Sequence, residues 1–307
     1  MIENGDRFKS IMSTTWELDF YSCPILDEQQ KKLWEVLICE SPLDIKAETD
    51  SLFRYAQFCP SNQVNSASLR QAIEDAIAQA PCPPDKIRFF RRQMTNMITK
   101  ACEDAGIPVY GSRRTIALHQ WMEERQQNYY PTLPNYQEKA TNPSVVLPFP
   151  NPAQLPDALI GQQWAFVTLE ASAFADLPDW DIGFGESFPL DMAGVSAEMR
   201  IPGVIIFSPR ALPLAGWMSG LDVAYLRYET QSGGNSYRAP IPRLLLETGS
   251  SESWVLANLT TDAQQTEAKN FEQAKRDAQN VHFLAVQSDP NSEAFAGFWL
   301  LQELNLA

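Results

Sequence analysis

The sequence predicts an α+β protein with two mixed α/β domains, mainly antiparallel or mixed sheets, and a proline-rich linker between the domains. A chain of 307 residues, 44% hydrophobic and 20% charged, is long enough to form more than one hydrophobic core. Strand-like and helix-like segments alternate in both halves without regular βαβ order, and prolines concentrate between them. We therefore expect domains at 1–135 and 157–307, joined by a linker at 136–156.

The first half begins with three expected strands and a helix. Aromatic and β-branched residues concentrate at 15–22, 32–39 and 52–58, and turn or proline signals separate these segments. Apolar residues then recur at helical spacing over 66–79. These four segments predict a sheet with a helix packed on it.

After a proline break, the rest of this half alternates between the two kinds of element. Strands are expected at 86–90 and 107–110, and helices at 93–105 and 115–128. Gly106 stands where a glycine commonly ends a helix. The order favours an open α+β arrangement.

The second half shows the same mixture. The elements expected are strands at 163–169, 203–207, 223–230, 243–247, 253–259 and 281–287, and helices at 262–279 and 292–304. Residues 176–191 are predicted to form a long acidic loop, and 232–235 a hairpin turn. A second α+β domain accounts for this pattern.

The net charge of −14 opposes general adhesion to nucleic acid. Residues 1–140 carry 16 basic and 19 acidic side chains, a net charge of −3, and residues 141–307 carry 8 and 19, a net charge of −11. Most of the negative charge therefore lies in the second half, which leaves room for a local basic patch in the first.

We expect a cytoplasmic protein. No stretch approaches the roughly 20 apolar residues of a membrane-spanning helix, and the first twelve residues contain acidic side chains and no apolar run. The five cysteines are scattered and have no two-residue spacing, which favours buried reduced thiols over zinc ligands or disulfides.

The motifs of common enzyme classes are absent or incomplete, and no cofactor or metal is expected. There is no nucleophile elbow, no phosphate-binding glycine loop and no EF-hand spacing, and the chain has only two histidines. Asp19 and Glu35 stand where a nuclease of the restriction-endonuclease type would place metal-binding carboxylates, but Leu37 occupies the position of the assisting lysine. The sequence therefore predicts a protein that is not an enzyme.

One segment, residues 86–114, departs from the acidic composition. It contains seven basic and two acidic side chains, a net charge of +5, with aromatic residues interleaved. Arginine and lysine contact phosphates and exposed aromatic rings stack on unpaired bases, so the segment is the candidate site for single-stranded RNA. The candidate RNA-binding residues are Lys86, Arg88, Phe90, Arg91, Arg92, Lys100, Arg113 and Arg114.

Two motifs at opposite ends of the chain carry a family resemblance. Residues 15–22 read TWELDFYS and are followed by Pro24 and by KLWE at 32–35, and Trp-Leu-Leu stands near the end. This pattern resembles the Tab-two/Atab-two (Tab2/Atab2) family of cyanobacteria and chloroplasts. Cys23 stands where the family pattern leads us to expect arginine. The family-motif residues are Trp16, Asp19, Phe20, Tyr21, Trp299, Leu300 and Leu301.

The resemblance implies an RNA-binding factor that promotes translation of a photosystem reaction-centre message through its leader, and photosystem biogenesis more broadly. Its expected partners are that single-stranded leader RNA and proteins of the ribosome or of photosystem assembly. Two alternatives remain open: a protein-binding assembly scaffold without intrinsic RNA binding, and a degenerate nuclease around Asp19 and Glu35.

Overall fold

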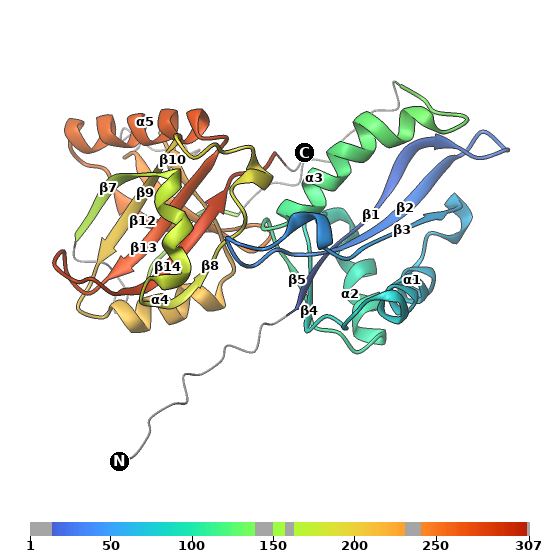
Figure 1. Cartoon of the computed structure of the whole chain (residues 1–307), viewed down its shortest axis with the longest axis horizontal. Helices are drawn as coiled ribbons and strands as arrows, with labels where there is room; N and C mark the ends of the chain where they lie inside the picture. The colour runs from blue at the N-terminus through green and yellow to red at the C-terminus, as the bar shows by residue number, and fades with distance from the viewer. Residues whose placement is uncertain (1–13, 139–149, 157–162, 231–240, 306–307) are drawn as a thin grey trace, which may run out of the picture.

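The computed structural model describes residues 14–138, 150–156, 163–230 and 241–305. We call 14–138 the N-terminal half and 150–305 the C-terminal half; the two lie side by side in Figure 1. Strands of the described residues form three sheets, flanked by helices. The α+β class predicted from the sequence is confirmed.

The N-terminal half contains one mixed sheet with the order β3-β2-β1-β4-β5. β1 pairs antiparallel with β2, and β2 antiparallel with β3, whereas β1, β4 and β5 run parallel. The strands are β1 (Thr15–Leu26), β2 (Lys32–Glu40), β3 (Arg54–Cys59), β4 (Lys86–Phe89) and β5 (Val109–Gly111). Each overlaps a strand expected from the sequence.

Helices cover both faces of this sheet because its strands alternate between two buried faces. Trp16, Leu18 and Phe20 of β1 join a core with α1 (Ser66–Gln79) and α2 (Thr95–Asp104). Glu17, Asp19 and Tyr21 take the intervening positions of β1, and Leu37 and Cys39 of β2, which pair with Asp19 and Glu17, pack with α3 (Ile116–Glu124). The polar residues of β1 therefore lie on the face that α3 covers.

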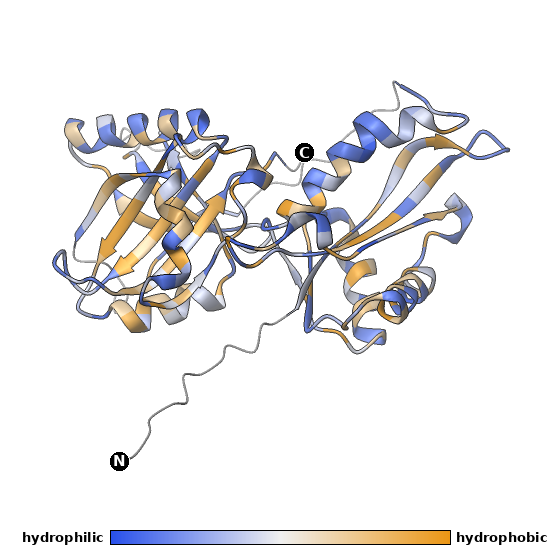
Figure 2. Cartoon of the chain, in the orientation of Figure 1, coloured by the Kyte–Doolittle hydropathy of each residue, from blue (hydrophilic) through white to orange (hydrophobic). Residues whose placement is uncertain are grey.

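The C-terminal half contains two sheets. One has the order β10-β11-β12-β6 and the other β7-β9-β13-β14-β8. The strands are β6 (Ala153–Gln154), β7 (Gln163–Glu170), β8 (Ile182–Glu186), β9 (Arg200–Phe207), β10 (Val223–Glu229), β11 (Arg243–Thr248), β12 (Glu252–Asn258), β13 (Val281–Gln287) and β14 (Phe295–Gln302). Both sheets contribute to a core with α4 (Ala211–Gly220) and α5 (Asp262–Asp277), and Figure 2 shows apolar strands beside the largely hydrophilic α5.

Two sequence predictions in this half were wrong, and one helix was missed. The helix expected at 292–304 is β14, a strand between β13 and β8 that is covered on both faces. The acidic loop expected at 176–191 contains β8, which pairs with β14, and α4 was not predicted at all. A strand buried on both faces loses the polar alternation that distinguishes it from a helix.

A single hydrophobic cluster joins the two halves. Leu37, Phe90 and Trp121 of the N-terminal half pack in the same core as Phe174 and Phe283 of the C-terminal half. The expected linker at 136–156 and the expected turn at 232–235 lie partly or wholly outside the described residues. The domain boundaries at 135 and 157 therefore stay predictions.

Candidate nucleic-acid interface

The basic segment 86–114 runs through β4, α2 and β5 to the start of α3, and much of it lies against the C-terminal half. Its side chains differ greatly in accessibility. Arg88, Arg113 and Arg114 are 4%, 6% and 5% exposed, and Phe90 is buried in the shared core. Arg91, Arg92 and Lys86 are partly buried, and Lys100 is exposed on α2 beside Asp104.

Arg88 and Arg114 hold two carboxylates of the C-terminal half. Arg88 binds Glu186 through two hydrogen bonds of 2.7 and 2.8 Å and reaches Asp222 at 2.8 Å. The Nε of Arg114 donates to Glu186 at 2.7 Å, and its Nη1 donates to the backbone oxygens of Val223 and Leu300. Burial alone would raise the pKa of Glu186, but Arg114 and Arg88 outweigh it and hold the pKa well below its usual range.

Arg113 is fixed by the neighbouring sheet. It donates to the Glu247 carboxylate at 3.0 Å and to the backbone oxygens of Thr248 and Glu252 at 2.9 and 2.7 Å. Its guanidinium also lies 5.1 Å from the centre of the Tyr225 ring. In this arrangement, the three buried arginines bind protein oxygens of the C-terminal half.

Asp19 and Glu35, the carboxylates considered for a nuclease centre, both lie on the face of the sheet beneath α3, and each binds an arginine. Arg91 donates to Asp19 at 2.8 and 2.6 Å, and Arg125 pairs with Glu35. The Glu35 carboxylate also accepts hydrogen bonds from Tyr21 and Tyr130. Within the described residues, no group of three or more histidine, cysteine, aspartate or glutamate side chains is placed to hold a metal ion.

The apolar residues of the two family motifs, one near each end of the chain, are buried in the hydrophobic cores. Trp16 and Phe20 are buried in the core beneath α1 and α2. Trp299 and Leu301 face the core with α4, and Leu300 faces the core shared by both halves. The backbone oxygen of Leu300 accepts from Arg114, so the C-terminal motif takes part in the contact between the halves.

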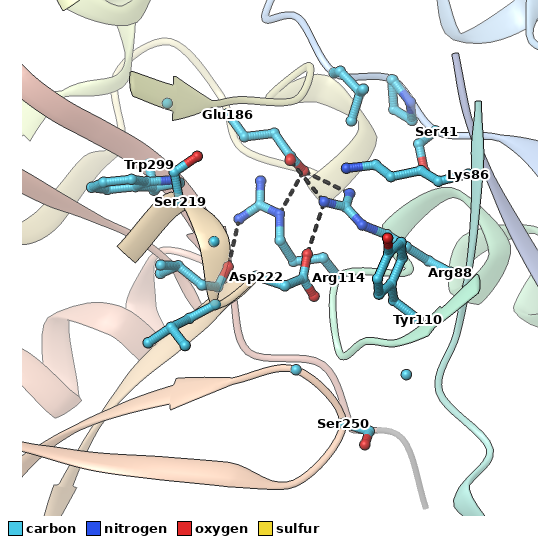
Figure 3. A pocket seen from close by; sticks show the side chains of 18 of the residues that line it. Ser41, Lys86, Arg88, Tyr110, Arg114, Glu186, Ser219, Asp222, Ser250 and Trp299 are labelled. Carbon is cyan, nitrogen blue, oxygen red and sulfur yellow. Dashed lines mark hydrogen bonds and ion pairs between the residues drawn. The ribbon is translucent and has the colours of Figure 1, made fainter. Parts of the chain in front are cut away.

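A cleft of about 1090 Å³ lies between the halves, and the residues of the Arg88–Glu186 network form part of its lining. Its N-terminal wall comes from the segment after β2 and from β4 and β5, and its C-terminal wall from the ends of β8 and α4 and the turn at 249–252. Figure 3 shows Lys86, Arg88 and Arg114 directed toward Glu186, with Tyr110 beside Arg88.

Lys86 and Tyr110 are the accessible cation and the accessible ring of this wall. Within the described part of the chain, the Lys86 ammonium has no ion-pair partner within 4 Å. Burial lowers the pKa of Lys86, and Arg88 lowers it further, against the attraction of Glu186 and Asp222. The Tyr110 side chain is 55% exposed.

Glu17 lies beneath the cleft on β1, opposite Arg88 of β4 in the parallel register. The carboxylate accepts a hydrogen bond from the Ser41 hydroxyl at 2.7 Å and another from the Leu118 amide in the first turn of α3 at 2.7 Å. Burial raises the pKa of Glu17 to about 7, although these donors and Arg88 oppose the rise.

Sequence reasoning missed Glu186 and Asp222 as interface residues. Glu186 was assigned to the acidic loop, and nothing in the local sequence around either residue indicates an arginine partner. Tyr110 was not among the candidate RNA-binding residues. Whether the eight candidate residues contact RNA stays a prediction.

Both halves of the chain match models of one protein family. Residues 15–125 match the model described as RNA-binding protein Tab2/Atab2 N terminal. Residues 142–302 match RNA-binding protein Tab2/Atab2, C-terminal domain. Together, the two matches extend over most of the chain.

Two curated relatives are similar over nearly the full chain. Protein TAB2 homolog, chloroplastic, of Arabidopsis thaliana is 37% identical over 300 residues, which cover 94% of this chain and 74% of the relative. The protein of the same name from Zea mays is 36% identical over 296 residues, covering 94% and 71%. No solved structure matches the chain.

Among the described residues, no helix combines the length and the apolar character needed to cross a membrane. The word chloroplastic belongs to the names of the two relatives. The cytoplasmic location expected from the sequence stays a prediction.

Proposed function

The chain belongs to the Tab2/Atab2 family of RNA-binding proteins, and from this premise we propose that it binds the leader of a photosystem reaction-centre message and promotes its translation. The observation that carries the proposal is the match of both halves to RNA-binding family models. The family is one of RNA-binding proteins and not of enzymes, and the arginine partners of Asp19 and Glu35 leave no carboxylate pair open for a metal there.

The accessibility of the basic segment supports a division of its proposed roles. Phosphate contact requires a cation that solvent reaches, and Lys86, Arg92 and Lys100 are all partly or fully exposed. We assign RNA contact to these three. Phe90 and the arginines at 88, 91, 113 and 114 support the surface through the core and the ion pairs described above.

The test is the affinity of the purified protein for a photosystem I leader RNA, measured by fluorescence anisotropy over a salt series. The variant Lys86→Gln/Arg92→Gln/Lys100→Gln is expected to bind at least tenfold more weakly. Its slope of log affinity against log salt should be smaller by roughly 0.7 for each phosphate that the removed side chains bind. Arg91 is left intact, because its removal would leave the buried Asp19 without its cation.

The matched control is Lys31→Gln/Arg70→Gln/Lys269→Gln, which removes the same charge from exposed positions outside the segment. We expect the control to bind nearly as tightly as the native chain. Equally weakened binding by both variants would contradict the assignment to 86–114, and absence of binding by the native chain at micromolar concentration would contradict intrinsic RNA binding.

A second candidate function, a protein-binding scaffold for photosystem assembly, is favoured by charge. Residues 141–307 carry 8 basic and 19 acidic side chains, a net charge of −11, which suits a basic protein surface better than RNA. Co-purification with identified ribosomal or photosystem subunits that survives nuclease treatment would favour this function. Release of those subunits on nuclease treatment would instead indicate that RNA bridges them.

A further inference from the structure

We propose that the cleft between the halves receives one unstacked nucleotide of a single strand, with its base on Tyr110 and its phosphate on Lys86. The inference rests on the RNA-binding function proposed above and adds the site and the form of the ligand. It is carried by the size of the cleft, the accessible cation, the exposed ring and the charges of the walls.

The volume of the cleft suits a ligand of nucleotide size. At about 1090 Å³ it slightly exceeds the range typical of small-molecule sites, roughly 300–1,000 Å³. Both halves contribute to its lining, and the shared core and the Arg88–Glu186 contact hold them together. The cleft is therefore formed before any ligand enters.

Lys86 supplies the positive charge for a phosphate. The neighbouring cations Arg88 and Arg114 are engaged by Glu186 and Asp222, whereas Lys86 has no ion-pair partner within 4 Å among the described residues. The ammonium is partly withdrawn from water and lies beside Arg88, so an anion there would stabilise its charged form. A phosphate oxygen satisfies this requirement.

Tyr110 supplies the surface for a base. It pairs with Arg88 across β4 and β5, lines the same cleft as Lys86 and is 55% exposed. An exposed aromatic side chain beside a cation is the arrangement on which an unpaired base stacks, and such stacking tolerates any base. A paired base has its faces covered by its neighbours, so the site selects single-stranded RNA.

Acidic side chains in the lining of the cleft limit how much of a strand can enter. Glu40, Asp44 and Glu252 line the cleft, and Asp44 and Glu252 are exposed. A run of phosphates through the cleft would meet these carboxylates on both walls, whereas one nucleotide against β4 and β5 meets Lys86 and Tyr110. Hydroxyl groups of Ser250 and Ser251 in the opposite turn are available to the ribose.

The experiment compares the binding of a ten-nucleotide uridine strand by the native chain and by Tyr110→Leu, Tyr110→Phe and Lys86→Gln. Lys269→Gln, at an exposed position on α5 outside both the cleft and the basic segment, is the control of equal charge. Tyr110→Leu is expected to lower affinity about tenfold while Tyr110→Phe keeps it, because stacking needs the ring and not the hydroxyl. Lys86→Gln should reduce the salt slope by roughly 0.7, the change expected when one phosphate is no longer bound.

A strand carrying 4-thiouridine gives an independent readout, since irradiation should crosslink it to the peptide that contains Tyr110. If the native chain binds the strand but the Tyr110 and Lys86 variants bind like Lys269→Gln, or if the crosslink lies elsewhere, the cleft is not the site and the RNA-binding function stands. If the native chain binds neither this strand nor the leader RNA, the proposed function fails and this site fails with it.

Discussion

Two buried glutamates show how the immediate partners of a carboxylate set its pKa. Glu186 binds two arginines, and its pKa falls well below the usual range. Glu17 lies nearby on β1 but accepts from a hydroxyl and an amide, so burial dominates and its pKa rises to about 7. The two groups therefore act in opposite directions when pH changes the stability of the protein.

Glu17→Gln is expected to stabilise the protein at alkaline pH. Because the pKa of Glu17 rises from 4.5 to about 7 on folding, the folded chain binds more protons between these values. The contribution of Glu17 is therefore full below pH 4.5 and is lost as pH rises through 7. At pH 8, the variant should gain on the order of 1–3 kcal/mol in unfolding free energy, and the gain should vanish near pH 4.5.

Urea unfolding at pH 5 and pH 8 measures this difference. Glu28→Gln, at an exposed position in the turn after β1, serves as the control and should leave the pH dependence unchanged. Equal stability of Glu17→Gln and the native chain at both pH values would contradict this prediction. It would show that the ionised carboxylate of Glu17 does not destabilise the folded chain at pH 8.

Individual site residues were the part of the molecule least accessible to sequence reasoning. Arg88 and Arg114 belong to a basic cluster in the sequence, yet their carboxylate partner Glu186 stands 98 and 72 positions away. Local charge density identifies cations but does not reveal distant ion-pair partners. The sequence therefore predicted the location of the candidate interface but not which of its cations remain accessible.

At the scale of elements, α1 shows how a polar face helps prediction. α1 begins and ends at the expected residues, because its buried side chains recur at helical spacing and Asn65 caps it. β14 failed for the opposite reason: Phe298 and Leu300 face one core, and Trp299 and Leu301 face another. A continuous apolar run of this kind is compatible with a buried helix as well as a buried strand.

The close packing of β9 against a side chain of β13 predicts that position 203 requires glycine. A Cβ on Gly203 of β9 would lie 2.3 Å from the Phe283 ring of β13, which packs against Phe174 and Phe298 and has little freedom to move. Gly203→Ala should therefore lower the unfolding free energy by about 1–3 kcal/mol, the usual cost of overpacking.

Denaturant unfolding measures this destabilisation, with Gly220→Ala as the control. Gly220 lies at the exposed end of α4, where a Cβ would meet no atom within 4 Å. Equal stability of the two variants would mean that the Phe283 ring moves aside at little cost.

At the scale of the whole molecule, the two halves are expected to unfold as one cooperative structure. Side chains from both halves share a core, and the Arg88–Glu186 ion pair crosses the same contact. A contact that is both apolar and charge-paired disfavours independent movement of domains. The sequence predicted most strands and helices of the two halves but not the contact between the halves. The residues that form this contact are distant along the chain, and no local pattern marks them.

Glu186→Gln tests this cooperativity. The substitution leaves Arg88 and Arg114 buried with a weakened partner, and breaking a buried ion pair typically costs about 3–5 kcal/mol. Because the halves share a core, we expect the destabilisation to appear equally in both. Native-state hydrogen exchange should show the same drop in protection at β1 of the N-terminal half and at β13 of the C-terminal half. The control Glu293→Gln, which changes an exposed carboxylate, should leave the protection of both strands unchanged. A drop confined to β13 would mean that the C-terminal half opens while the N-terminal half stays folded, and that the cleft between them is a contact of two separately stable units.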